Sequence, residues 1–201
     1  MKLNFSFAKT TIIASLMIIV IHFGGLSTNP NYDKPSPVVL SDDKEKSLED
    51  FKVILSVLKN PRCMNCHPSG DVPLQGNDQH LHRPLIVRGV ADYGPAAIKC
   101  SACHHEENNI YANVPGAPKW AVAPRSMGWV GLTDEQIGEA LMNKTKNGGR
   151  SPKDLVQHMG FDSLVMWGWH PGPGRTPIPI PLEDFRKVLF DWLATGAYVP
   201  K

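Results

Sequence analysis

Four cysteines carry the clearest chemical signal in this chain, which contains no others. They fall into two pentapeptides, CMNCH at residues 63–67 and CSACH at residues 100–104, and each reads C-x-x-C-H. This pattern is typical of c-type haem attachment, because two thiols on one short turn bond to the porphyrin while the next histidine ligates its iron. The sequence therefore predicts two covalently bound haem c groups. The predicted attachment residues and proximal iron ligands are Cys63, Cys66, Cys100, Cys103, His67 and His104.

Other uses of paired cysteines fit the sequence less well. Zinc ribbons also contain two C-x-x-C pairs, but the 33 residues between Cys66 and Cys100 exceed the usual ribbon spacing. A ribbon also has no need of a histidine after each pair. Disulfides within each pair would constrain little of the chain. A thioredoxin-like redox site would follow a strand, and no strand pattern precedes either pair.

Each predicted haem leaves a second axial position on its iron. Histidine or methionine fills this position in electron carriers, and an open position allows small-molecule chemistry. His82 lies in a polar loop between the two motifs, and His158 shares the apolar face of a predicted helix with Leu155 and Met159. We expect His82 and His158 to be the distal ligands, although histidines in such places are also common as loop and core residues. The remaining alternatives are His80, His105 and Met127.

The N-terminus has the layout of a bacterial export signal. Lys2 and Lys9 precede an apolar run that ends at Phe23. This run is short for a bilayer span, which needs about 20 apolar residues. We expect residues 1–27 to be a signal peptide or an N-terminal membrane anchor, followed by a proline-rich linker over residues 28–41. The expected location is the periplasm or the periplasmic face of the inner membrane.

Composition limits the classes of protein that the chain can belong to. Hydrophobic residues make up 42% of the 201 residues and charged residues 20%, so the chain can form a core and is not disordered throughout. The formal net charge of +2 argues against a nucleic-acid binder. Without residues 1–27 the formal charge is zero. Haem propionates would then make the protein acidic, which favours a partner with a basic docking patch.

Two long amphipathic patterns predict helices near the ends of the expected domain. Residues 42–60 carry one apolar stripe, and Ser41 is the expected cap. Pro61 is expected to stop this helix just before Cys63. Residues 182–195 carry a second stripe and are predicted to form the last helix.

Capping residues predict two further helices. The run Thr133-Asp134-Glu135-Gln136 is a capping box and opens a helix that we expect to reach about Lys146. Ser151 is the expected cap of the helix that carries His158, with Pro152 at its first position. No run of residues shows a convincing strand alternation.

The segment 166–181 is rich in proline and glycine, so we expect an extended arm over the haem core. Within it, Trp167 and Trp169 are candidates to pack on a porphyrin, and the alternative is that they are ordinary core residues. The two attachment motifs begin 37 residues apart, which is too close for two separate domains of about 50 residues or more. We therefore predict one compact, mainly α domain over residues 42–201, with much irregular structure and both haems in a shared core.

With these motifs, the chain resembles a family of small exported dihaem cytochromes c of bacteria. The resemblance covers roughly residues 60–198, and its recognisable segments are CMNCHPSGD, PLQG, CSACH, VPGAPKW, NGGRS, LVMWGW and PGPGRTPIP. It extends across His82, Met127 and His158. Some relatives are labelled as a subunit of isoquinoline 1-oxidoreductase, a molybdenum hydroxylase. The resemblance implies covalent binding of two haems and electron transfer.

These observations predict a periplasmic dihaem c-type cytochrome that transfers electrons between redox partners. The expected partner is a redox protein that acts as donor or acceptor, for example a dehydrogenase. The alternative is a dihaem peroxidase-like or other small-molecule haem enzyme, which needs one open iron site and an acid–base group beside it. We expect a carrier or an electron-transfer subunit rather than an enzyme.

Overall fold

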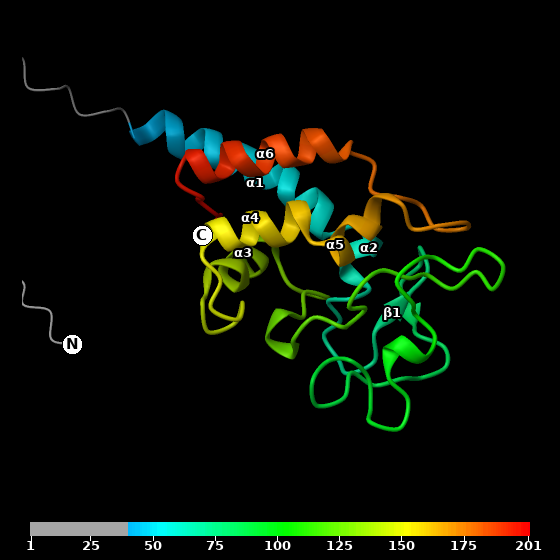
Figure 1. The fold of residues 1–201 in the computed structure, drawn as a ribbon. Helices are drawn as coiled ribbons and strands as arrows, with labels where there is room; N and C mark the ends of the chain where they lie inside the picture. Colours follow the sequence, from blue (N-terminus) through cyan, green and yellow to red (C-terminus); the bar gives the residue numbers. More distant parts are fainter. Residues whose placement is uncertain (1–39) are drawn as a thin grey trace, which may run out of the picture. The chain divides into compact units, whose positions relative to one another are not determined.

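A computed structural model of the protein describes residues 40–201, and these residues are mainly helical, as predicted. The expected leader, residues 1–27, lies outside the described residues, as does the expected linker up to residue 39. The longest helices pack together on one side of the described region, and the loops that carry the two cysteine motifs lie beside them (Figure 1).

Helices α1 (Leu40–Leu58) and α6 (Leu182–Ala194) form the centre of the helical part. They lie side by side and run in opposite directions (Figure 1). Their apolar stripes face each other, as amphipathic helices require, and the rings of Phe51 and Trp192 have centroids 5.8 Å apart. Ile54 and Leu189 are fully buried in the same core. Both predicted helices are confirmed.

The boundaries of the first helix differ from the prediction. Ser41 lies inside α1 rather than at its cap, and the helix ends at Leu58. Pro61 does not simply terminate a helix but occupies the first turn of a new one, α2 (Pro61–Met64). The side chain of Asn60 caps this turn by accepting a hydrogen bond from the backbone N–H of Arg62 at 2.9 Å. Proline is favoured at a first helical position, where its missing N–H costs nothing.

Capping boxes open the next two helices. Thr133 and Gln136 begin α3 (Asp134–Met142) as predicted, and Ser151 begins α4 (Pro152–Phe161) with Asp154 as its partner. The first of these helices is shorter than expected. It ends at Met142 instead of reaching Lys146, because the side chain of Asn143 accepts hydrogen bonds from Thr145 and turns the chain.

The predicted extended arm is wrong over residues 166–169. This part of the chain is helical instead. It ends the short helix α5 (Ser163–Met166) and forms the 3₁₀ turn η3 (Trp167–Trp169). Asp162 caps α5 by accepting from the N–H of Leu164 at 3.0 Å. The prolines begin only at Pro171, and Gly168 is the one glycine in the helical segment, so the preceding residues do not prevent a helix.

The loops between the helices contain two short strands and two 3₁₀ turns. Strands β1 (Leu74–Gln75) and β2 (His80–Leu81) pair antiparallel and form the only sheet in residues 40–201. The 3₁₀ turns η1 (Cys100–Ala102) and η2 (Arg125–Met127) lie further along the chain. None of the helices in the described residues has the length and apolar character that a membrane crossing requires.

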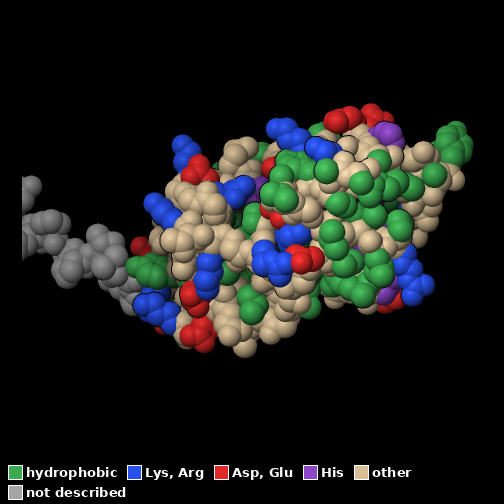
Figure 2. All heavy atoms as spheres, turned by 90° about the horizontal axis from the view of Figure 1, so that it is seen from below, with side chains coloured by type: hydrophobic (Ala, Val, Ile, Leu, Met, Phe, Trp, Pro, Cys, Tyr) green, Lys and Arg blue, Asp and Glu red, His purple; other side chains and the backbone are tan. Residues whose placement is uncertain are grey.

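Large hydrophobic side chains remain exposed mostly in the loops between residues 81 and 111. They are Leu81, Leu85, Val87, Val90, Tyr93, Ile98, Ile110 and Tyr111. Figure 2 shows hydrophobic side chains gathered over this loop-rich part of the molecule. The helical part instead buries most of its hydrophobic side chains in the core between α1, α4 and α6, and leaves Phe161 and Phe190 exposed.

Candidate functional site

Both cysteine motifs begin with a tight helical turn. The backbone N–H of His67 donates to the carbonyl of Cys63 at 3.2 Å, and the N–H of His104 donates to the carbonyl of Cys100 at 2.9 Å. The first turn belongs to α2 and the second to η1. Since both motifs close the same i to i+4 hydrogen bond, each histidine follows its cysteine pair in a similar local backbone.

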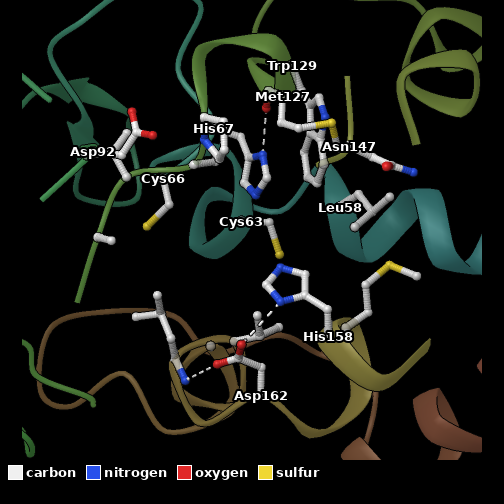
Figure 3. A pocket seen from close by; sticks show the side chains of 18 of the residues that line it. Leu58, Cys63, Cys66, His67, Asp92, Met127, Trp129, Asn147, His158 and Asp162 are labelled. Atoms are coloured by element: carbon white, nitrogen blue, oxygen red, sulfur yellow. Dashed lines mark hydrogen bonds and ion pairs between the residues drawn. The ribbon is translucent and has the colours of Figure 1, made fainter. Parts of the chain in front are cut away.

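The first motif opens into a cavity of about 390 Å³, whose lining includes Cys63, Cys66 and His67. His158 of α4 lines the same cavity. In Figure 3 the imidazoles of His67 and His158 project from opposite sides into one space, with the sulfur of Cys63 beside it. The structure therefore brings one predicted proximal histidine and one predicted distal histidine together.

The second motif opens into a cavity of about 440 Å³, lined by Cys100, Cys103 and His104. His82 lines it as well, and the rings of His82 and His104 have centroids 5.9 Å apart. Two metal–nitrogen bonds of about 2 Å each would separate two axial nitrogens by about 4 Å. The ring separation is therefore compatible with one iron between these two histidines.

The imidazole rings of all four histidines are oriented in the same way, by a contact at Nδ1. In each, Nδ1 lies within hydrogen-bond distance of an oxygen, so that the ring is oriented and Nε2 is left for another partner. The pairs are His67 with the carbonyl of Met127 at 2.7 Å, His104 with that of Pro115 at 2.7 Å, His82 with that of Pro84 at 2.8 Å, and His158 with the carboxylate of Asp162 at 3.2 Å.

The alternative ligands are placed differently. Both ring nitrogens of His80 are engaged, Nδ1 with Asp78 at 2.7 Å and Nε2 with Gln75 at 2.9 Å. His105 is exposed and lines neither cavity. Met127 is buried at the first cavity, but its carbonyl holds the ring of His67, so it lies on the side of the predicted proximal ligand.

Tryptophans support the rings of both predicted proximal histidines. Trp129 stacks on His67 with ring centroids 3.5 Å apart, and Trp120 stacks on His104 at 4.6 Å. Trp167 meets Trp120 edge to face at 5.0 Å and lines both cavities. The sequence predicted no role for Trp120 or Trp129, because both lie in loops without periodicity, although Trp120 ends the segment VPGAPKW.

Trp169, the other tryptophan considered in the sequence, is a core residue. Its ring centroid lies 5.3 Å from that of Phe185, and its indole N–H donates to the carbonyl of Ile180 at 2.8 Å. It lines neither of the two cavities. Of these two tryptophans, only Trp167 therefore lines the cavities beside the cysteine motifs.

Burial favours the neutral forms of the ionisable groups in the first cavity. It raises the pKa of Cys63 to about 12 and that of Cys66 to about 11. It lowers the pKa of His67 to about 3, and it also lowers the pKa of His158 and of His104 in the second cavity. These imidazoles are therefore neutral at neutral pH, which is the form that ligates a metal.

The two cavities differ in charge. The first cavity is lined by two acidic side chains, Asp92 and Asp162, and by three basic ones, Arg62, Lys119 and Arg150. Among the described residues, none of those lining the second cavity is acidic. The second cavity is instead lined by four basic side chains, those of Arg62, Arg83, Lys99 and Arg175.

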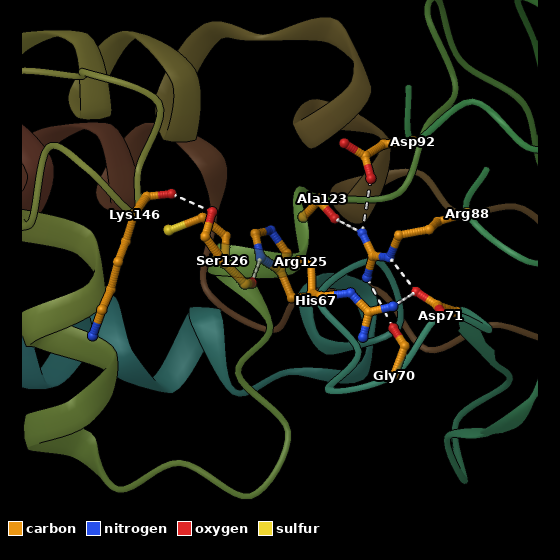
Figure 4. Close-up of polar contacts among 10 residues, drawn as sticks. His67, Gly70, Asp71, Arg88, Asp92, Ala123, Arg125, Ser126 and Lys146 are labelled. Atoms are coloured by element: carbon orange, nitrogen blue, oxygen red, sulfur yellow. Dashed lines mark hydrogen bonds and ion pairs between the residues drawn. The ribbon is translucent and has the colours of Figure 1, made fainter. Parts of the chain in front are cut away.

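A buried arginine holds together the loops behind the first motif (Figure 4). Arg88 donates to the carbonyl of Gly70 and to Asp92, both at 2.9 Å, and to the carbonyl of Ala123. Its Nε also lies 3.3 Å from the carboxylate of Asp71. The N–H of Ala123 in turn donates to the carbonyl of Cys66 at 2.8 Å, so this network fixes the backbone that supports the first motif.

A zinc ribbon would require the four thiols to surround one ion. In this structure they do not. Cys63 lines only the first cavity, Cys100 and Cys103 line only the second, and Cys66 borders both. All four cysteines are free thiols. Within residues 40–201, no group of three or more His, Cys, Asp or Glu side chains is arranged to hold a metal ion by itself.

Comparisons of the chain with models of protein families, with characterised proteins and with solved structures give no match.

Proposed function

We propose that this chain is a dihaem c-type cytochrome that carries electrons between redox proteins. The observation that carries the proposal is the pairing of histidines. Each C-x-x-C-H motif opens into a cavity of its own, and each cavity contains a second histidine whose Nδ1 is held by an oxygen.

The chemistry of the side chains fits haem c. In the first cavity, Cys63 and Cys66 would form the thioethers, and His67 and His158 would hold the iron. The second cavity supplies the equivalent set, which consists of Cys100, Cys103, His104 and His82. When bound, each haem supplies a one-electron couple between ferric and ferrous iron. The protein orients the four imidazoles, and the apolar and aromatic side chains that line the cavities would enclose the porphyrins.

The two cavities are adjacent, which supports electron exchange between the two proposed haems within one domain. Arg62, Cys66 and Trp167 line both of them. A porphyrin attached at Cys66 would therefore border the space in which the second porphyrin is held.

Pairing of two histidines in each cavity favours a carrier over an enzyme. A haem peroxidase or similar enzyme needs an iron with one open position. His82 and His158 would each close such a position, and an electron carrier needs no space for a small substrate. The proposed partners are therefore redox proteins that act as donor and acceptor.

The export signal read from residues 1–27 supports a periplasmic location, because C-x-x-C-H motifs receive their haem in that compartment. We propose that the protein works there, either free or attached through its N-terminal segment. Fractionation of cells expressing the full chain, followed by mass measurement of the N-terminus, tests both parts of this proposal.

The decisive experiment is a haem count by pyridine haemochrome, together with an absorption spectrum of the resting protein from a host that matures c-type cytochromes. We expect two haems per polypeptide, both low-spin. Replacing Cys100 and Cys103 with alanine is expected to leave one haem, as is replacing Cys63 and Cys66. Absence of covalent haem would overturn the proposal, and one high-spin haem would favour the enzyme.

A further inference from the structure

Two arginines at the second cavity lack an acidic partner. Arg62 is 4% exposed, and its Nε has no hydrogen-bond partner. The only polar contacts of the Arg62 guanidinium are made by Nη2, which donates to the carbonyl of Gly76 at 2.8 Å and to Oδ1 of Asn77 at 3.0 Å. Within the described residues, no carboxylate forms an ion pair with this guanidinium.

Arg175 is in a similar position. It is half-buried in the arm that follows η3, and it donates only to neutral oxygens of Asn113, Pro171 and Pro173. No carboxylate in the described part of the chain pairs with it either. Burial, and after it the positive charge of Arg175, lowers the pKa of Arg62.

A buried charge without a counter-ion is strongly unfavourable. Arg62 is such a charge, and the half-buried Arg175 adds a second positive charge beside it, at a cavity with no acidic lining. Together they indicate that an anionic ligand completes the site. The planar fork of a guanidinium matches a carboxylate, which it binds through two parallel hydrogen bonds. A haem brings two carboxylates, its propionates, and all its remaining surface is apolar.

We propose that Arg62 and Arg175 bind the propionates of the haem in the second cavity and thereby give this haem the more positive reduction potential of the two. The inference rests on the proposed function, since it requires haem to be present. Positive charge beside the porphyrin disfavours the ferric state, which carries one more positive charge than the ferrous state.

In the first cavity, a carboxylate beside a histidine has the opposite effect on the potential. There the carboxylate of Asp162 lies 3.2 Å from Nδ1 of His158, whereas His82 meets only the carbonyl of Pro84. A carboxylate at this position makes the imidazole a stronger donor to iron and so stabilises the ferric state. The protein that has gained one electron should therefore hold ferrous iron in the second cavity and ferric iron in the first.

The test is a spectroelectrochemical titration of the purified holoprotein with both haems attached. The wild-type protein should show two midpoint potentials. Arg175→Gln, at a residue that lines the second cavity only, should lower the higher one and leave the lower one in place, whereas Asp162→Asn should raise the lower one. Arg62→Gln, at a residue that lines both cavities, should lower the higher one and is not required to leave the lower one in place. Lys187→Gln removes a positive charge from a side chain that is 75% exposed on α6 and should move neither.

Electron paramagnetic resonance of the half-reduced protein assigns the potentials independently. The ferric signal that remains should be the one whose g values change in Asp162→Asn, because that carboxylate contacts a ligand of the first cavity only. Should the buried Arg62→Gln variant fail to fold, Arg175→Gln carries the same test from a half-buried position.

The inference would be overturned by a single unresolved wave, by an Arg175→Gln variant that moves the lower potential or neither, or by a remaining ferric signal that Asp162→Asn leaves unchanged. These results require two haems to be attached and low-spin. They are therefore distinct from failure of the proposed function, which the haem count and the resting spectrum report.

Discussion

The rings of His82 and His104 lie 5.9 Å apart, centroid to centroid, across the second cavity. One histidine comes from the loop after β2 and the other from the second cysteine motif. Both are oriented by backbone carbonyls, of Pro84 and Pro115 respectively. Because neither carbonyl can rotate away as a side chain can, the chain itself holds the two imidazoles in place.

Replacing His82 with alanine should therefore convert one of the two haems to the high-spin state, because the iron loses its distal nitrogen while its thioethers remain. The absorption and magnetic resonance spectra of the ferric protein report this change. The matched control is His80→Ala, two residues away, whose ring nitrogens contact Asp78 and Gln75 instead. If His82→Ala stays low-spin, or if His80→Ala becomes high-spin, the ligand assignment is wrong.

Replacing Arg88 with glutamine should destabilise the protein by about 3 kcal/mol, since it leaves carbonyl and carboxylate groups without their charged donor. The control is Arg125→Gln. Arg125 pairs with the same Asp71, but its side chain is 61% exposed, and exposed ion pairs contribute less than about 1 kcal/mol. Denaturant unfolding of the two holoprotein variants measures the difference.

A third variant, Arg88→Lys, tests whether stability depends on the hydrogen bonds of the guanidinium or only on its positive charge. Arg88→Lys should not restore stability, because one ammonium cannot reach the separate acceptors that the guanidinium fork serves. Equal losses in Arg88→Gln and Arg125→Gln would contradict this account of the network.

Neighbouring positions on α6 provide a test of the core. Leu189 is fully buried against α1 and α4, whereas the adjacent Phe190 is 51% exposed. Leu189→Ala should lower the free energy of unfolding by about 2–5 kcal/mol, as buried leucines do. Phe190→Ala should cost less than about 1 kcal/mol, although it removes the larger side chain. The reverse order, measured by denaturant unfolding, would show that the face of α6 is wrongly assigned.

Stability should fall on mild acidification. Burial lowers the pKa of His67 to about 3 and also lowers that of His104 and His158. Unfolded histidine titrates near 6.5, so below that pH the unfolded chain takes up protons that the folded chain excludes. Iron ligation has the same sign, because a ligated imidazole must be neutral. Between about pH 6.5 and 5, each such histidine contributes a slope of up to about 1.4 kcal/mol per pH unit.

Denaturant unfolding of the holoprotein across this range checks the sign and the slope. His158→Met removes one titrating imidazole and retains a side chain that can ligate iron, so the slope should become shallower. A protein that becomes more stable as the pH falls from 6.5 to 5 would contradict the neutral state of these histidines.

Local sequence determined the attachment motifs and most of the helices. C-x-x-C-H depends on five consecutive residues, and capping boxes such as Thr133 with Gln136 depend on four. The stripes of α1 and α6 were readable because burial on one side of a helix imposes a period of 3.6 residues. Where a local signal misled, as at Pro61 or in residues 166–169, a neighbouring capping side chain supplied the helix start instead.

Only the tertiary structure decided which histidine faces which motif. The sequence offered His82 and His158 as ligands without assigning them, and long-range packing placed His158 opposite His67 and His82 opposite His104. The same holds for Arg62, Arg175 and the stacked Trp120 and Trp129, which lie in loops or short turns. Loops have no repeating burial pattern, so the neighbours of their side chains depend on contacts between distant segments rather than on the residues beside them.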